Sequence, residues 1–209
     1  MRMLPIVLRA TLVTLAGAGT LIAQSAQSAG SAARPAPVIL TAAQQIAAAI
    51  LPLPDSLRAG ARVWGYAEGA RFVELRPGTG SMTCIADDPK DDRFHVACYA
   101  NTMEPYMARG RELRAQGAGQ NAVDSARTAD VLAGRVRMPS VAMLYSLSGT
   151  AASYNAATNV ATGARPLFVV YTPFATAEQL GLSAIPRRGQ PWMMHGGQPG
   201  AHIMFVPEM

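Results

Sequence analysis

The sequence predicts an α+β fold, a single domain in which a largely antiparallel sheet carries two or three helices on one face. Half of the 209 residues are hydrophobic and 15% are charged, so the chain has enough apolar side chains for one packed core. Short segments with the alternating pattern of β-strands occur on both sides of the middle of the chain. Between them, over residues 102–133, apolar residues recur at the three-to-four spacing of helices. Helices and strands that are segregated in this way are typical of α+β domains.

Residues 1–28 have the pattern of a signal peptide. Arg2 and Arg9 supply a positive start, residues 10–23 form a weakly apolar run, and small residues follow it. The run is shorter than the roughly 20 residues that span a bilayer, so a retained membrane anchor is the alternative interpretation. We expect a periplasmic or secreted protein with no membrane span in the mature chain.

Residues 29–37 are expected to be a flexible linker because Ala, Ser, Gly and Pro dominate them and cannot bury enough surface to order the segment. The folded domain is therefore predicted at residues 38–209.

Cys84 and Cys98 are the only two cysteines of the chain. Export would carry them into an oxidising compartment, where we expect them to form a disulfide bond with each other. A reactive thiol is the alternative, but it would need a base beside a sulfur of low pKa, and the acidic turn between the cysteines does not indicate one.

The first predicted element of the domain is a short helix over residues 41–51. Thr41 is a good cap, strong helix formers follow it, and Pro52 ends the pattern. Four strands are predicted next as two hairpins: 61–66 with 71–76, and 81–86 with 94–99. We expect these four strands to form an antiparallel meander, with the disulfide joining the last two.

Two helices are predicted in the middle of the chain, over residues 102–116 and 122–133. Pro105 falls in the first turn of the first helix, where its missing N–H does no harm. Several arginines make the pair basic, and we interpret them as a solvent-facing surface. These arginines are Arg109, Arg111, Arg114, Arg127, Arg135 and Arg137.

The last third of the chain returns to strands. The predicted strands are 142–147, 167–171, 192–195 and 202–206, with a single helical turn at 176–180. Residues 148–165 are small, polar and glycine-bearing, so we expect an exposed loop of the kind that often carries function.

The net charge argues against nucleic acid as a partner. The formal charge is +5, and subtracting Arg2 and Arg9 of the leader leaves +3. The remaining cations are scattered along the chain, whereas a phosphate-tracking surface would need them gathered in a stripe. We therefore expect a small ligand or another protein as the partner.

The C-terminal segment contains the most unusual cluster of side chains. If residues 196–200 form a hairpin loop, Met194 faces His202 and Trp192 faces Met204 on one side of the ladder. Thioether and imidazole ligands select Cu(I), so Met194, His202 and Met204 are a candidate copper site. The alternative is that the methionines and the indole fill a core around a satisfied histidine.

Four aspartates crowd into the turn between the two cysteines: Asp87, Asp88, Asp91 and Asp92. Oxygen ligands at this density could hold Ca²⁺, but the spacing lacks the alternation of a calcium-binding loop. Lys90 and Arg93 also offset half of the charge. We interpret the segment as a solvated turn.

The chain shows no recognisable hydrolase motif. Ser146 and Ser148 flank a glycine-bearing turn but do not form Gly-x-Ser-x-Gly, and His95, His195 and His202 have no partner that the sequence specifies. We assign no catalytic residue and favour a protein that is not an enzyme.

Four patches of sequence resemble a group of exported bacterial proteins without an assigned activity. They are residues 74–89 with the pattern Gly-Thr-x-x-x-Thr-Cys, the second cysteine Cys98, residues 145–149, and the ending 201–204 with His-Ile-Met. The resemblance implies a disulfide and a single domain, and it implies no activity, cofactor or catalytic residue.

The function expected from the sequence is an exported, non-catalytic domain that binds a small ligand or a protein, without a cofactor. The loop 148–165 and the C-terminal hairpin are expected to form the mouth of its binding site. A periplasmic copper-binding module is the first alternative, and a small secreted hydrolase is the second.

Overall fold

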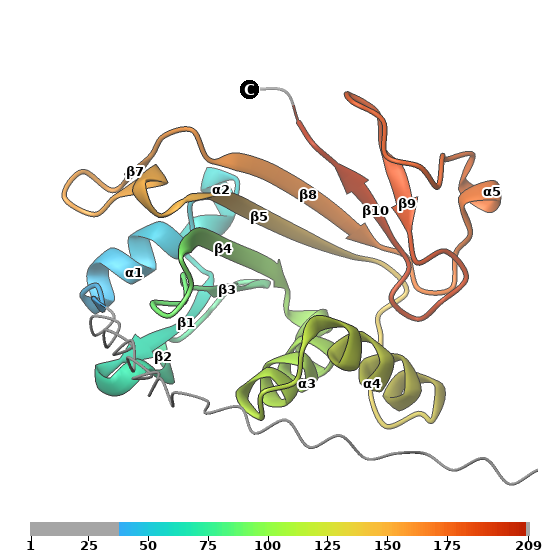
Figure 1. Ribbon diagram of the computed structural model, residues 1–209, viewed down its shortest axis with the longest axis horizontal. Coiled ribbons are helices and arrows are strands. Elements are labelled where there is room, and N and C mark those ends of the chain that lie inside the picture. The colour runs from blue at the N-terminus through green and yellow to red at the C-terminus, as the bar shows by residue number, and fades with distance from the viewer. Residues whose placement is uncertain (1–37, 208–209) are drawn as a thin grey trace, which may run out of the picture. The chain divides into compact units, whose positions relative to one another are not determined.

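An eight-stranded sheet organises residues 38–207, the part of the chain that the computed structural model describes (Figure 1). The strand order is β2-β1-β3-β4-β5-β8-β10-β9. Every neighbouring pair is antiparallel except β1 and β3, which are parallel. The strands are β1 (Arg62–Ala67), β2 (Arg71–Arg76), β3 (Met82–Ile85), β4 (Arg93–Ala100), β5 (Ala142–Thr150), β8 (Arg165–Tyr171), β9 (Trp192–Met194) and β10 (His202–Phe205). The predicted α+β class with a largely antiparallel sheet is confirmed.

The predicted signal peptide at 1–28 and linker at 29–37 lie outside the described residues. Within residues 38–207, no helix is both long enough and apolar enough to cross a membrane.

The first four strands form the two predicted hairpins but not a meander. β3 pairs with β1 rather than with β2, so the connection 77–81 crosses the start of β1 to reach its other side. Two amides of this connection donate to the Gly60 carbonyl oxygen at 2.8 and 3.0 Å. A Cβ atom on Gly78 would stand 2.7 Å from the backbone nitrogen of Arg62, so glycine is what permits the close crossing. Alternation along the chain predicts strands, but it does not predict which strands become neighbours.

Helix α1 (Ala42–Ala49) covers one face of this half of the sheet, and the short helix α2 (Asp55–Arg58) follows it. Thr41 caps α1 and forms a capping box with Gln44, which confirms the predicted cap. Beneath α1, Cys84 on β3 lies directly opposite Cys98 on β4, and the two form the predicted disulfide. Both cysteines are fully buried in the core between α1 and the sheet.

The two predicted middle helices are present on the opposite face as α3 (Glu104–Ala115), preceded by the 3-10 turn η2 (Asn101–Met103), and α4 (Gln120–Leu132). Met103 of η2 and Tyr106 and Met107 of α3 pack on the sheet. The sheet thus carries the α3–α4 pair on one face and α1 on the other (Figure 1). Strand β4 is apolar in both directions because Phe94 and Val96 contact the core beneath α1 while Tyr99 contacts α3.

Residues 148–165 are largely exposed, as the sequence predicts, but they contain regular structure instead of forming one loop. β5 continues to Thr150, and the turn η3 (Ala151–Ser153) leads into a small separate hairpin of β6 (Tyr154–Asn155) and β7 (Val160–Ala161). The Tyr154 ring stacks on Phe94 at 5.4 Å between centroids, and its hydroxyl donates to the Gln44 carbonyl oxygen at 3.1 Å. The segment therefore packs against α1, away from α3 and α4.

The C-terminal hairpin has the predicted register. Met194 is the partner of His202, and Trp192 is the partner of Met204. The predicted helical turn is α5 (Ala177–Leu180), which Thr176 caps. The turn η1 (Glu68–Ala70) connects β1 to β2 in the first predicted hairpin, with Gly69 in the left-handed region at φ 70°.

Candidate functional site

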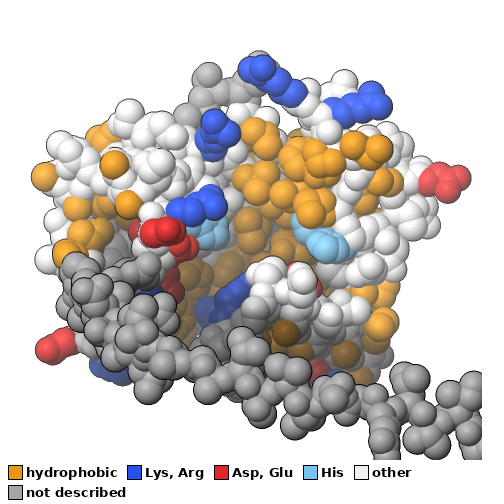
Figure 2. Space-filling view, in the orientation of Figure 1, with side chains coloured by type: hydrophobic (Ala, Val, Ile, Leu, Met, Phe, Trp, Pro, Cys, Tyr) orange, Lys and Arg blue, Asp and Glu red, His pale blue; other side chains and the backbone are white. Residues whose placement is uncertain are grey.

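A cleft with a volume of about 1610 Å³ lies between the open face of the sheet and the α3–α4 pair. Figure 2 shows the hollow on this face of the molecule, with basic and histidine side chains on its walls. Side chains of β3, β4, β5, β8 and β10 form one wall, and side chains of α3 and α4 form the other. The strand alternation explains the first wall, because every second residue of these strands points away from α1.

A row of aromatic rings runs through the cleft from α3 to the C-terminal hairpin. The Tyr106 ring meets Tyr171 edge-on at 6.1 Å, Tyr171 meets His202 at 5.1 Å, and His202 meets His195 at 5.5 Å, all between centroids. Gly200 of the hairpin lies close to Tyr106 of α3, since a Cβ atom on Gly200 would stand 2.9 Å from the Tyr106 hydroxyl oxygen. The row passes from the helix to the hairpin at this point. Burial raises the pKa of Tyr171 to about 12, so its phenol is neutral at physiological pH.

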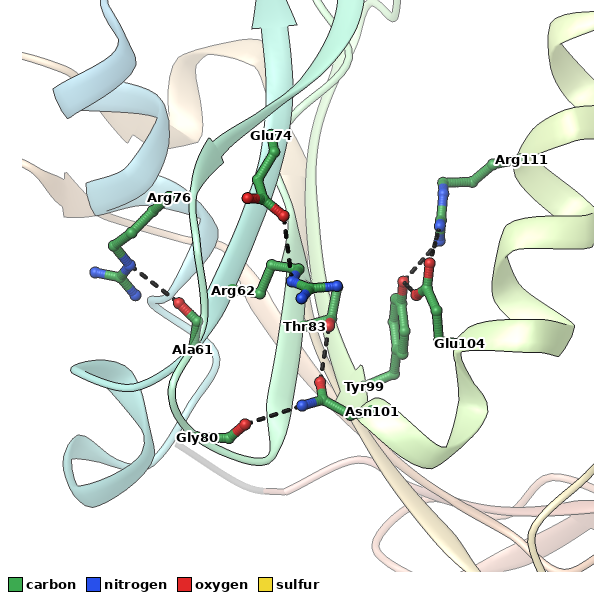
Figure 3. A network of polar contacts seen from close by, with 10 residues as sticks. All are labelled: Ala61, Arg62, Glu74, Arg76, Gly80, Thr83, Tyr99, Asn101, Glu104 and Arg111. Carbon is green, nitrogen blue, oxygen red and sulfur yellow. Dashed lines mark hydrogen bonds and ion pairs between the residues drawn. The ribbon is translucent and has the colours of Figure 1, made fainter.

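Tyr99, Glu104 and Arg111 form a closed polar network beside this row (Figure 3). Arg111 donates to the Tyr99 hydroxyl at 2.6 Å and to the Glu104 carboxylate at 2.5 Å, and Tyr99 donates to the same carboxylate. Burial raises the pKa of Tyr99. Because Glu104 neutralises Arg111, this arginine has little charge left to offer a ligand.

Arg127 on α4 is a buried guanidinium in the wall of the cleft. The residue is 6% exposed, and it lies across α3 where Gly110 provides the space. A Cβ on Gly110 would stand 1.9 Å from its Nη2 atom. Its Cζ atom lies 4.4 Å from the centroid of the Tyr106 ring, and Nη2 reaches the Met107 sulfur at 3.8 Å. The interpretation of all six helix arginines as a solvent-facing surface is therefore wrong for Arg127.

The sequence holds a weak signal for this buried arginine. Tyr106 and Gly110 are four residues apart on one face of α3, so the Tyr106 ring and the space beside the glycine lie one helical turn apart. A glycine inside a helix costs stability unless close packing requires it. Only the packing of α3 on α4 shows that an arginine uses the gap.

Arg114 stands at the exposed rim near Arg127. It donates to the Gln120 side-chain oxygen at 2.9 Å, and Gln120 in turn donates to both Asp124 carboxylate oxygens. Desolvation lowers the pKa of Arg114, and the neighbouring positive charge of Arg127 lowers it further. Two like charges therefore sit at this end of the cleft.

The acidic turn lines another part of the cleft. Asp87 accepts a hydrogen bond from the His95 backbone N–H at 2.7 Å. Burial raises the pKa of Asp87 to about 6 against the lowering effect of this hydrogen bond, and the charges of Asp91 and Asp88 add to the rise. Asp88 and Asp91 accept from backbone amides two residues on, as in a turn. Among residues 38–207, no group of three His, Cys, Asp or Glu side chains could hold a metal ion.

The three candidate copper ligands lie along the C-terminal hairpin. Met194 and His202 are cross-strand partners, while Met204 stands two residue pairs farther along on the same face, opposite Trp192. The His202 Nδ1 atom donates to the Gly200 carbonyl oxygen at 2.7 Å, which leaves Nε2 as an acceptor. Burial lowers the pKa of His202, so its ring is neutral at pH 7. His195 was not among the predicted copper ligands, but a left-handed backbone (φ 53°) places it beside His202.

The serines that were considered as nucleophiles have other surroundings. Ser146 is buried, and its hydroxyl donates to the Leu167 carbonyl oxygen at 3.4 Å. Ser148 lies opposite His95 on the neighbouring strand. Among the hydrogen bonds of the described residues, none joins a serine hydroxyl to a histidine ring.

Of the two segments expected to form the mouth of a binding site, one lines this cleft and the other does not. The C-terminal hairpin lines the cleft through His195, Gln198 and His202. Residues 148–165 do not line it, because Tyr154 anchors that segment on α1 across the sheet.

No family model, curated protein or solved structure matches this chain. Its function is therefore inferred from the cleft and the side chains in it.

Proposed function

We propose that the protein is an exported, non-catalytic binding domain whose small-molecule ligand occupies the cleft between the sheet and the α3–α4 pair. The observation that carries the proposal is the cleft itself, with its volume of about 1610 Å³ and its row of aromatic rings. Ligand sites are typically concave, largely apolar and supplied with a few convergent polar groups. A volume above the usual ~300–1,000 Å³ of such sites suits a ligand with an extended body.

The lining groups can orient a ligand through hydrogen bonds. Burial raises the pKa values of Tyr99 and Tyr171 and lowers that of His202, so all three are neutral hydrogen-bonding groups at pH 7. The Tyr99 hydroxyl is already held by Arg111 and Glu104. A few fixed polar groups among aromatic rings are typical of sites that bind a small molecule.

The proposed location, periplasmic or secreted, rests on the disulfide and on the leader pattern of residues 1–28. A buried disulfide persists in oxidising compartments and is rare where glutathione keeps thiols reduced. Fractionation of the native host tests the location. We expect the protein outside the cytoplasm, shortened at its N-terminus and without alkylatable thiols, and a full-length cytosolic form with two free thiols would contradict it.

Native mass spectrometry of protein purified from its own cell envelope tests the cleft. The test variant is Ala97→Trp, because Ala97 on the central strand β4 lines the cleft and an indole there would fill its floor. The matched control is Ala157→Trp, in the exposed segment on the other side of the sheet. We expect a retained small molecule on the parent and on the control, and its loss from Ala97→Trp.

Either of two results would contradict the proposal. One is a molecule that Ala97→Trp retains as well as the parent does. The other is a parent that carries no molecule and whose melting temperature does not move with any compound of a broad metabolite panel.

Copper binding is the second candidate, and the hairpin register favours it. His195 and His202 lie at one end of the cleft, Met194 is the strand partner of His202, and the Nε2 atom of His202 is a free acceptor. Sulfur and imidazole ligands suit Cu(I). Titration against a chromogenic Cu(I) chelator should show one equivalent bound, lost in His202→Ala and Met194→Leu and kept in Met138→Leu. Chelator that retains all of its copper in the presence of the parent protein would exclude this candidate.

A further inference from the structure

The guanidinium of Arg127 is buried and forms no ion pair with any described residue. Arg127 is 6% exposed, and its Nε atom has no hydrogen-bond partner among the described residues. A buried charge is costly unless a partner compensates it, and arginine stays charged under all physiological conditions. A group of this kind in the wall of a cleft calls for an anion from outside the chain.

The carboxylates of the two helices are already engaged elsewhere. Glu104 pairs with Arg111, Asp130 pairs with Arg109 and Arg135, and Glu112 pairs with Arg109. Asp124 lines the same part of the cleft but accepts both hydrogen bonds from Gln120. No acid of α3 or α4 thus forms an ion pair with Arg127.

The surroundings hold Arg127 in one place. Its guanidinium lies over the Tyr106 ring with Cζ 4.4 Å from the centroid, and Gly110 leaves the room for it on α3. A cation on a ring face is attracted by the ring quadrupole, which fixes the plane of the donors. The planar fork of arginine matches the two oxygens of a carboxylate or a phosphate.

A second cation stands beside the first. Arg114 at the rim lines the same cleft. Desolvation lowers the pKa of Arg114, the positive charge of Arg127 lowers it further, and the negative charge of Asp124 raises it. Because Arg114 and Arg127 carry like charges, an anion near both would be attracted to each. The turn with Asp87 and Asp91 makes another part of the cleft lining acidic. Near α3 and α4, Arg114 and Arg127, which form no ion pair with a described residue, outnumber the carboxylate of Asp124, so this part of the cleft suits an anionic group.

We propose that the ligand of the cleft carries an anionic oxygen group, a carboxylate or a phosphate, which Arg127 binds with Arg114 beside it, while the ligand body lies along the Tyr106–Tyr171–His202 row. This inference rests on the proposed function, since it names the chemistry of the ligand in the same cleft. The side chains on which this inference depends lie on both walls of the cleft, the helix wall and the sheet wall.

Three aromatic probes that differ in one group test the inference: benzoate, phenyl phosphate and the neutral benzamide. Binding is followed by NMR titration of the full protein, with the Nε–H signal of Arg127 observed in arginine-labelled samples. We expect at least one anion to bind about tenfold or more tightly than benzamide, which is the effect of a charge-assisted hydrogen bond. We also expect that anion to shift the Arg127 Nε–H signal, and the stronger of the two anions identifies carboxylate or phosphate chemistry.

Arg127→Met tests the residue, because the thioether keeps the apolar packing over Gly110 without the charge. The preference for the anion should fall to within about twofold of benzamide in this variant. Arg137→Met is the matched control, because Arg137 is exposed and does not line the cleft, and it should keep the preference. The parent Nε–H signal gives the answer without a substitution if Arg127→Met does not fold.

The possible results separate this inference from the proposed function. Equal binding of the three probes by the parent, or no binding of either anion, overturns the anionic ligand but leaves the retained molecule and the Ala97→Trp test standing. An anion preference that survives in Arg127→Met, with no shift of the parent Nε–H signal, overturns the assignment to Arg127. A parent that carries no molecule, and whose melting temperature does not move with any compound of the metabolite panel, overturns the proposed function.

Discussion

Gly110→Ala is expected to destabilise the protein even though it replaces a glycine inside a helix. Alanine is normally better than glycine in a helix interior by about 1 kcal/mol. Here, however, the new Cβ would stand 1.9 Å from Arg127 Nη2 and 2.3 Å from Cζ, so the guanidinium has to leave its place on Tyr106. Gly110 is buried, and the backbone of α3 cannot yield without disturbing its contact with the sheet.

The size of the effect follows from two opposing contributions. Overpacking a well-filled site costs about 1–3 kcal/mol, and the displaced cation also loses its contact with the ring, about 1 kcal/mol or more for a desolvated pair. The helix propensity of alanine returns about 1 kcal/mol. We therefore expect Gly110→Ala to lower the free energy of unfolding by about 1–3 kcal/mol.

A double-mutant cycle isolates the contact with Arg127. In an Arg127→Ala background the space is vacant, so Gly110→Ala should raise the free energy of unfolding by about 1 kcal/mol instead. The four proteins are compared by urea unfolding, with the midpoint and the slope fitted separately. If Gly110→Ala stabilises the parent as much as it stabilises Arg127→Ala, the argument that Arg127 lies across Gly110 is refuted.

Three further predictions concern the sheet and its two covered faces. Replacing Cys84 and Cys98 by serine should lower the free energy of unfolding by about 3 kcal/mol, because the bond closes a loop with a sequence separation of 14; an unchanged urea midpoint would contradict this. For Asp87, whose pKa burial raises to about 6, the favourable contribution is complete below the unfolded value near 4 and is lost as the pH rises through 6. Asp87→Asn should match the parent at pH 4 and exceed its stability at pH 8 by about 1–3 kcal/mol, and parallel pH profiles in thermal melts would count against the assignment. Gln45 is buried and links α1 to β1, because its side chain donates to the Tyr66 carbonyl oxygen and accepts from the Tyr66 N–H. Gln45→Leu should therefore lower the free energy of unfolding, followed by urea, by about 2–3 kcal/mol. A loss below about 0.5 kcal/mol would show that water replaces the amide.

Local sequence patterns predicted the elements because their physics is local. The cap at Thr41, the alternation in residues 94–99 and the helical spacing in 102–116 depend on neighbours within a few residues. The register of the C-terminal hairpin was predictable for the same reason, since a short loop and a period of two decide which residues face each other. The order of the strands was not predictable in this way, because the connection 77–81 carries the chain past β1 and β3 pairs with β1 instead of β2.

The candidate site was predictable only in part. The sequence indicated the end of the cleft at His202, because unusual side chains gather there within a few positions. It gave no sign that residues 148–165 would turn to α1, since Tyr154 finds Phe94 from a distant segment. Nor could it separate Arg127 from the solvent-facing arginines around it, because spacing along a helix does not show which cation a neighbouring helix covers.

By itself, the sequence determined the α+β class, the pairing of Cys84 with Cys98 and the strand and helix segments of the domain. Each of these depends on periodicity, on caps or on the only available partner. The tertiary structure alone decided that β3 joins β1, that α1 and the α3–α4 pair take opposite faces, and that a cleft with a buried, unpaired Arg127 remains between them. These features depend on contacts between segments far apart in the chain, whose free energies no local pattern records.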